Sequence, residues 1–202
     1  MLLSRWQHLM KLMELPENLA TYHALIKAYS EKHRKYHNVS HLDSVFTWLD
    51  SVDHLTVNKG PIELALWFHD AIYKPFSSSN ESDSADWARK FLDENNISQQ
   101  TQELVYQLVM ATSHSSIPKS DDEKLIVDID LSILGQPEDR YEAFSTAVRS
   151  EYRLVPSSIY ARNRRSVLVA SLNRERIYSS EFFYKTLEKQ ASKNLQSELN
   201  RL

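Results

Sequence analysis

Apolar residues recur at intervals of three and four positions along most of the chain, which is the spacing of one face of an α-helix. Two such stripes stand near the beginning of the sequence: Trp6, Leu9, Met10 and Met13, and then Leu19, Tyr22, Leu25, Ile26 and Tyr29. No segment alternates convincingly between apolar and polar residues, as a half-buried strand would. The pattern therefore predicts an all-α fold, a helical bundle of roughly nine or ten helices.

Capping residues mark where the predicted helices begin and end. Asn38 has the side chain of a helix N-cap, and Gly60 followed by Pro61 ends one helix and starts the next, because proline fits the first helical position. The helix after Pro61 contains the sequence LALWFHDAIY and is apolar on nearly all sides, so we expect it at the centre of the fold. Ser120 and Glu123 have the spacing of a capping box. The later helices are expected at 81–94, 98–114, 120–135, from 137 onward, 157–176 and 180–202.

The composition, with 42% apolar and 25% charged residues, is that of a globular protein with a real core. At 202 residues, one domain is the default expectation. We therefore predict a single domain over residues 1–202. The N-terminal helices in residues 1–30 are expected to pack on it, and the C-terminal helices in residues 150–202 to complete it.

Three features of the composition exclude whole classes of function. The two glycines leave no Gly-rich loop for phosphate, so P-loop and Rossmann fingerprints are excluded. The absence of cysteine excludes disulfides, thiolate zinc sites and a Cys nucleophile. The formal charge of -3 gives no general attraction to nucleic acid or anionic lipid, and the longest apolar runs, such as residues 64–68, are far too short to span a membrane. Since the first residues also lack the pattern of a signal peptide, we expect a cytoplasmic protein with no nucleic-acid or membrane partner.

Ionisable residues inside apolar helices are the strongest functional signal. His69 and Asp70 lie in LALWFHDAIY, and no Lys or Arg occurs between Lys59 and Lys74. A buried carboxylate without a partner costs several kcal/mol or becomes protonated. The sequence must therefore bring a cation to this helix from elsewhere, and a metal ion would serve.

A second acidic pair lies in LIVDIDLSIL, at residues 125–134. Asp128 and Asp130 are about 200° apart around a helix, so only one of them can face a shared site. Asp130 has apolar neighbours three and four positions away, whereas Asp128 has Lys124 and Ser132 nearby. We therefore predict that Asp130 is the buried carboxylate and that Asp128 forms a salt bridge or a supporting hydrogen bond.

A third segment, RYHNVSHLDSV, contributes His37 and His41, four positions apart. Imidazole together with carboxylate suits a divalent ion that keeps open positions for water. The predicted ligand set is His41, His69, Asp70 and Asp130, which would leave two positions of an octahedron for chemistry. The expected cofactor is a divalent metal ion, with Mn, Fe, Co, Mg, Ni and Zn all left open.

The combination of HxxxH, HD and a later Asp in an all-helical chain resembles the HD-domain superfamily of metal-dependent phosphohydrolases. YHNVSH is similar to a segment of cyclic-nucleotide phosphodiesterases, and Asp130-Leu131-Ser132 is similar to their last metal-ligand segment. A group of small bacterial predicted phosphohydrolases is more similar still, from about residue 30 to the C-terminus. The segments that carry this likeness are WFHDAIY, NESDSA, ATSH, DIDLSILG, VRSEY, NRRSVL and RIY.

The resemblance implies roles for individual residues. His41 would be a metal ligand and His37 would protonate the leaving oxygen, while Glu81, at the start of a helix, would orient or deprotonate the attacking water. Asp70 would take part in both metal binding and catalysis. His114 would contact phosphate or hold a second metal, although it could equally complement a helix dipole.

The region from Arg149 to Tyr178 contains seven Arg, no Lys and two acidic residues, and so has a local charge of +5. Because the guanidinium group grips phosphate oxygens in pairs, Arg149 and Arg164 are candidate phosphate contacts. A solvated helix face is the alternative for each of them. Tyr73 and Phe76, near the irregular loop at residues 74–80, are candidate stacking partners for a nucleobase.

The leading hypothesis is a metal-dependent phosphohydrolase that uses metal-activated water on a phosphoester or phosphoanhydride of a small molecule, with a nucleotide as the first candidate. The alternative is a metal- or nucleotide-binding sensor of the same fold that does not turn over. A di-iron oxygenase would need two further His ligands between His69 and Asp130, and only His114 lies there. Hydrolysis of stringent-response alarmones is not favoured, because Ala71-Ile72 stands where an acidic pair is expected. A homodimer is left open.

Overall fold

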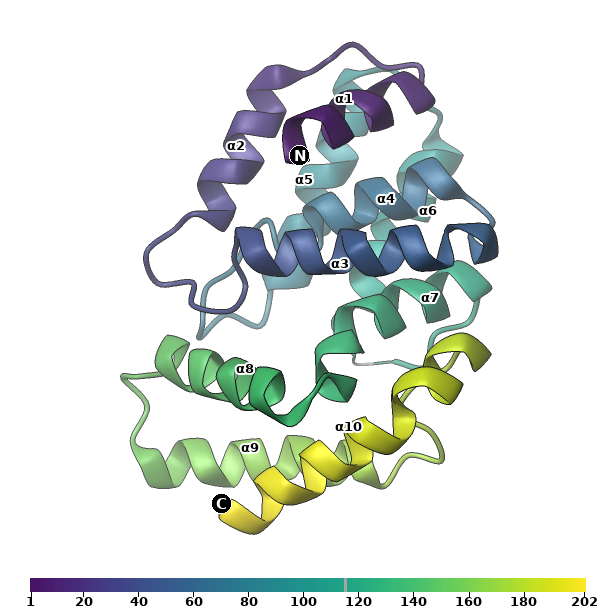
Figure 1. The fold of residues 1–202 in the computed structure, drawn as a ribbon. Helices are drawn as coiled ribbons and strands as arrows, with labels where there is room; N and C mark the ends of the chain where they lie inside the picture. The colour runs from purple at the N-terminus through teal and green to yellow at the C-terminus, as the bar shows by residue number, and fades with distance from the viewer. Residues whose placement is uncertain (115) are drawn as a thin grey trace. The chain divides into compact units, whose positions relative to one another are not determined.

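The computed structural model describes residues 1–114 and 116–202 (Figure 1). Within these residues the chain forms ten α-helices and two short 3-10 helices, and no strand is present. The predicted all-α fold with nine or ten helices is therefore confirmed. The chain divides into two compact units, Met1–Val127 and Asp128–Leu202. None of the helices in the described residues has the length and hydropathy needed to cross a bilayer.

The first unit is built around one apolar helix. Its elements are α1 (Leu2–Leu12), α2 (Leu19–Tyr29), α3 (Val39–Val52), the 3-10 helix η1 (Asp53–Leu55), α4 (Lys59–Phe68), α5 (Asn80–Glu94), α6 (Gln99–Ala111) and the first part of α7 (Asp121–Asp130). Helix α4 packs against α1, α3, α5 and α6, and every residue from Ile62 to Phe68 is buried. The expectation that this helix lies at the centre is therefore confirmed.

Aromatic side chains fill the space around α4. The ring of Trp67 lies 5.2 Å from the ring of Trp6 on α1, edge to face, and 4.8 Å from the ring of Phe46 on α3. Trp6 in turn lies 5.8 Å from Phe91 on α5. Each such pair adds about 0.5–1.5 kcal/mol to the burial of its apolar area. This cluster fixes the two helices, α3 and α4, that carry the candidate metal ligands.

Side-chain caps begin several helices where the sequence predicts them. The Asn38 side chain accepts a hydrogen bond from the Ser40 amide at 2.8 Å, at the start of α3. Ser120 accepts from the Glu123 amide at 3.1 Å, as in a capping box. The Glu123 carboxylate, however, accepts from the Lys119 amide, not from Ser120. A cap of this kind stabilises its helix by about 1 kcal/mol.

Helix ends differ from the predicted ones at four places, one of which is the last helix but one, which ends at Leu172 and not at residue 176. Helix α4 ends at Phe68, so that His69 and Asp70 lie in the turn that follows it. Helix α6 ends at Ala111, and the backbone is left-handed at His114, with φ 54°. Helix α7 ends at Asp130 and tightens into a 3-10 helix. The spacing of apolar residues alone does not show where these helices end.

The second unit is a smaller helical assembly. It comprises η2 (Leu131–Gly135), α8 (Glu138–Glu151), α9 (Ser157–Leu172) and α10 (Glu181–Arg201). Helix α10 packs against η2 and α9. The Asn194 side chain donates to the carbonyls of Leu134 and Gln136, both at 2.8 Å, and so ties α10 to the end of η2.

Close packing between η2 and α10 yields a test of the fold. A Cβ atom added at Gly135 would lie 2.5 Å from the Leu187 Cβ and 2.9 Å from the Leu187 carbonyl oxygen, so backbone must move. Gly135→Ala is expected to lower the free energy of unfolding by about 1–3 kcal/mol, as overpacking does. Urea denaturation measures it. Gly60→Ala is the control, since the nearest atoms that its Cβ meets outside its own helix are side-chain atoms of Met13 and Leu12, not backbone; an equal or larger loss in that variant would contradict the account.

Candidate metal centre

His69 and Asp70 are placed by the end of α4. His69 caps the C-terminus of this helix and is only 1% exposed, while the Asp70 side chain is 17% exposed. The Tyr29 hydroxyl bridges the turn: it accepts from the Asp70 amide and donates to the Trp67 carbonyl, both at 3.3 Å. Burial raises the pKa of Tyr29 to about 12, so its hydroxyl stays protonated and able to donate.

His41 comes from α3, one turn after the Asn38 cap. It is 4% exposed, on the buried side of the helix with Leu42 and Val45. Because α3 packs on α4, the cap, the packing and the turn together bring His41 to the His69–Asp70 turn.

Three ligand-type atoms converge within the first unit. The Nε2 atoms of His41 and His69 are 3.0 Å apart, and the Asp70 Oδ2 lies 3.3 Å from the His69 Nε2 and 3.6 Å from the His41 Nε2. Ligands bonded to one ion at ~2.1 Å are separated by about 3.0 Å at the adjacent corners of an octahedron and about 3.4 Å in a tetrahedron. The three atoms therefore have the spacing of a two-histidine, one-carboxylate face.

A hydrogen bond at the Nδ1 atom of His69 shows which nitrogen of the ring carries a proton. The His69 Nδ1 lies 2.8 Å from the Leu66 carbonyl oxygen, which can only accept, so Nδ1 carries a proton. In the neutral ring, Nε2 then presents a lone pair towards the His41 nitrogen and the Asp70 oxygen. A lone pair that faces a carboxylate requires a proton or a cation between them. Such a carbonyl–histidine contact is also the usual outer support of a metal-bound imidazole.

The charge state of Asp70 favours a cation as well. Burial alone would raise the pKa of Asp70, but in the metal-free site the positive charge of protonated His69, His37 and His41, and a hydrogen bond from the protonated His69 ring, hold that pKa well below its ordinary value. Asp70 therefore remains an anion at neutral pH. An anion held beside two imidazole nitrogens is the donor set that a divalent ion accepts.

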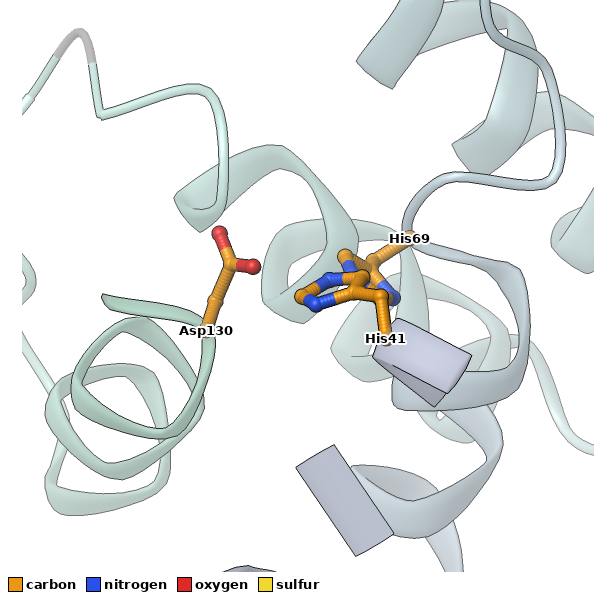
Figure 2. Close-up of side chains that lie close together, drawn as sticks. All are labelled: His41, His69 and Asp130. Atoms are coloured by element: carbon orange, nitrogen blue, oxygen red, sulfur yellow. The ribbon is translucent and has the colours of Figure 1, made fainter. Parts of the chain in front are cut away.

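Asp130 is the last residue of α7 and the third residue of the second unit. His41, His69 and Asp130 each offer one ligand atom, these atoms lie within 4.8 Å of one another, and the group could hold a metal ion (Figure 2). The expectation of a metal-binding His and Asp cluster is supported at this level. The identity of the ion stays open.

The burial predicted for the acidic pair of α7 is wrong. Asp128 is 0% exposed, whereas Asp130 is only half-buried. The Asp128 carboxylate accepts hydrogen bonds from the amides of Ser179 at 2.9 Å and Ser180 at 2.6 Å, at the N-terminus of α10. Free amide groups at a helix start satisfy a buried carboxylate without a cation. The supporting hydrogen bond predicted for Asp128 is therefore present, in a buried position that its neighbours in sequence do not indicate.

His37 lies in the bend before the Asn38 cap, outside α3. Its ring stacks on Tyr73, with centroids 4.2 Å apart, and lies 6.1 Å from the ring of His41. Tyr73 is 7% exposed and engaged by this stack, so its predicted availability for a nucleobase is wrong. Phe76, at 68%, is exposed.

Glu81 lies in the first turn of a helix, as predicted, whereas His114 lies three residues beyond the end of α6 and not at the end of the helix as predicted; the proposed roles of both stay predictions. Glu81 is in the first turn of α5 and half-buried. His114 follows the end of α6 in the left-handed backbone conformation and is half-buried.

Arg149 and Arg164 both have structural partners within the second unit. Arg149 donates to the carbonyls of Tyr152 at 2.7 Å and Val155 at 3.0 Å, which joins the end of α8 to the start of α9. It also lines a pocket of about 620 Å³ together with Tyr160. Arg164 forms a two-pronged ion pair with Glu198, at 2.8 and 2.9 Å. These contacts account for both guanidinium groups, and a phosphate contact by either one stays a prediction.

Arg34 and Tyr29 are site residues that sequence reasoning missed. Tyr29 reads as one more apolar position on α2, and Arg34 follows Lys32 and His33 in a polar stretch typical of a surface. In the structure both are buried and hydrogen-bonded to the backbone of the His69–Asp70 turn. No local pattern distinguishes such residues, because their partners are carbonyl and amide groups about 40 positions away.

Comparison of the chain with family models, with curated proteins and with solved structures found no match. The resemblance to the HD-domain superfamily therefore stays a prediction from the motifs themselves.

The Arg164–Glu198 pair yields a stability prediction. Burial alone would raise the pKa of Glu198, but the hydrogen bonds from Arg164, Tyr141 and Ser145 and the Arg164 charge hold that pKa below its ordinary value. A lowered pKa stabilises the fold above about pH 4.5, and the stabilisation is lost as the pH falls through the folded-state pKa. Glu198→Gln is expected to cost about 2–4 kcal/mol at pH 7 and progressively less below pH 4.5.

Urea denaturation of both proteins at pH 7 and at pH 3.5 measures this difference. Glu142→Gln is the matched control, because Glu142 pairs with Arg201 at the surface and its loss should change the free energy of unfolding by well under about 1 kcal/mol. A Glu198→Gln cost that stays constant across this pH range would contradict the account.

Proposed function

We propose that this protein is a metal-dependent phosphohydrolase that acts on a phosphoester or phosphoanhydride of a small molecule, with a nucleotide as the first substrate class to test. One observation carries the proposal: the ligand atoms of His41, His69 and Asp70 lie 3.0–3.6 Å from one another in a largely buried site. The motif resemblance to HD-domain phosphohydrolases supports the choice of reaction.

The residues present fit a divalent ion. His41, His69 and Asp70 would hold it, and Asp130 is the proposed fourth ligand. Such an ion supplies Lewis acidity, lowering the pKa of a coordinated water and neutralising charge on a phosphoryl group. With only imidazole and carboxylate donors, the set suits Mn(II), Fe(II) or Co(II), with Mg(II), Ni(II) and Zn(II) as further candidates.

The chain's own groups perform the remaining tasks. Asp70 is held as an anion, and the Leu66 carbonyl fixes the tautomer of His69, so the site needs no reorganisation before it binds a cation. His37, oriented by its stack on Tyr73, is proposed to protonate the leaving oxygen at one of its ring nitrogens. Glu81 is proposed to orient the attacking water. His114, Arg149 and Arg164 remain candidate phosphate contacts.

The first test is metal content together with hydrolysis. Purified protein loaded with Mn(II) or Co(II) is expected to release phosphate or pyrophosphate from a panel of nucleotides. His41→Ala and His69→Ala should lose both the metal and the activity, because each removes one ligand. His54→Ala, at an exposed histidine of η1, is the matched control and should retain both.

The outcomes separate the proposed enzyme from its rival. Bound metal with no hydrolysis of any nucleotide, but with tight nucleotide binding, would favour the non-catalytic sensor and contradict the proposal. Full metal retention by His41→Ala and His69→Ala would show that the ion binds elsewhere.

A second test concerns the proton donor. His37→Gln is expected to lower kcat about 10²–10⁴-fold on a substrate with a poor leaving group, while leaving the affinity for Mn(II) nearly unchanged. On a p-nitrophenyl ester the loss should be much smaller, because p-nitrophenolate leaves without protonation. Steady-state kinetics on both substrate types make the comparison. Equal losses on both would remove His37 from the role of general acid.

A further inference from the structure

Arg34 is a buried cation beside the candidate metal centre. Its side chain is 0% exposed, although it lies in the irregular segment between α2 and α3. The Glu31 carboxylate accepts a hydrogen bond from Nε at 3.0 Å, but its side chain is 46% exposed. An ion pair with an exposed carboxylate offsets little of the free-energy cost of burying a guanidinium group. The other contacts of Arg34 must therefore explain its position.

Those contacts are backbone carbonyls from two separate segments. One terminal nitrogen, Nη1, donates to the His37 carbonyl at 3.2 Å and to the Asp70 carbonyl at 2.5 Å. The other, Nη2, donates to the Ala71 carbonyl at 2.9 Å. The guanidinium also lies over the rings of Tyr29 and Tyr73, at 5.3 and 5.5 Å.

Both segments lie outside helices, and each holds a residue of the proposed site. The bend that contains His37 and the turn that contains Asp70 have no helical hydrogen-bond ladder to fix them. A planar guanidinium bonded to carbonyls of both sets the distance between them, since its N–H directions are rigid. The 4.2 Å stack of His37 on Tyr73 depends on the same spacing.

We propose that Arg34 is a positioning residue of the metal centre: through the carbonyls of His37, Asp70 and Ala71 it holds the ligand Asp70 and the proton donor His37 in one rigid unit. The inference rests on the function proposed above and assigns to Arg34 no contact with metal or substrate. Because the proposal concerns how the two segments are arranged, it predicts an effect of Arg34 on metal binding as well as on hydrolysis.

Lysine at this position separates geometry from charge. It keeps the positive charge but offers a single ammonium in place of the fork, so it cannot hold carbonyls of both segments with the same geometry. Arg34→Lys is expected to weaken Mn(II) binding about 10–100-fold, the usual effect of losing an outer support of a ligand. Titration followed by electron paramagnetic resonance of free Mn(II) measures this without any assay of hydrolysis.

Arg5→Lys is the matched control. Arg5 is another partly buried arginine of the first unit, on α1, and it binds the carboxylates of Glu63 and Asp50 at 2.8–2.9 Å. Its substitution should lower the thermal midpoint while leaving the Mn(II) affinity within about twofold, since charge pairs far from the ligands set stability alone. A drop in affinity equal to that of Arg34→Lys would reduce Arg34 to a general stability residue and overturn the proposal.

Hydrogen exchange provides a second measurement that needs no variant, in case Arg34→Lys does not fold. In the wild-type protein, peptides covering residues 35–38 and 69–72 are expected to gain the same protection factor when Mn(II) is added. Protection of residues 69–72 alone would overturn the coupling.

The failures can be told apart. In one outcome the wild-type protein binds Mn(II) but hydrolyses nothing, and Arg34→Lys binds Mn(II) more weakly. That outcome supports the positioning role and contradicts the proposed function. An unchanged Mn(II) affinity in folded Arg34→Lys overturns the positioning role whatever the hydrolysis assays give. Wild-type protein that binds no Mn(II) overturns both.

Discussion

Two imidazole nitrogens and a carboxylate oxygen, held within 3.6 Å of one another in a mostly dry site, are the constraint from which the rest of the site follows. The two histidines are buried and the Asp70 side chain is only 17% exposed, so water screens these groups weakly, and in neutral His69 the Leu66 carbonyl leaves a lone pair pointing at Asp70. Such an arrangement is stable only if protons or a metal ion lie between the donors. Other parts of the chain form contacts around the site that keep these atoms together.

Those supports come from three levels of structure. The apolar helix α4 is buried on all sides and so fixes the position of the turn that follows it. The Asn38 cap fixes the start of α3, and with it His41. Tyr29 and Arg34 then bind the backbone of the turn itself, where no helical ladder is present. Metal ligands placed by rigid elements and supported by outer hydrogen bonds are what pre-organised sites require.

Sequence reasoning found what depends on local pattern. The helical class, the central place of α4 and the caps at Asn38 and Ser120 all follow from spacing and side-chain chemistry over a few residues. His69 and Asp130 are predicted because polar groups in apolar helices are conspicuous, and His41 because it follows His37 by four positions. Asp128 was misjudged because the amides that satisfy it are some 50 positions away, at the start of α10. Arg34 was missed for the same reason, since nothing near it in sequence shows that it is buried.

The most direct test of the central claim is the coordination of the ion itself. X-ray absorption spectroscopy of the Co(II)-loaded protein should show a first shell of nitrogen and oxygen at about 2.1 Å, with the outer-shell scattering of two imidazole rings. In His41→Ala and in His69→Ala, the scattering of one imidazole ring should disappear, which would identify these two histidines as ligands. A spectrum with oxygen ligands alone and no imidazole scattering would contradict the claim that these two histidines hold a metal ion.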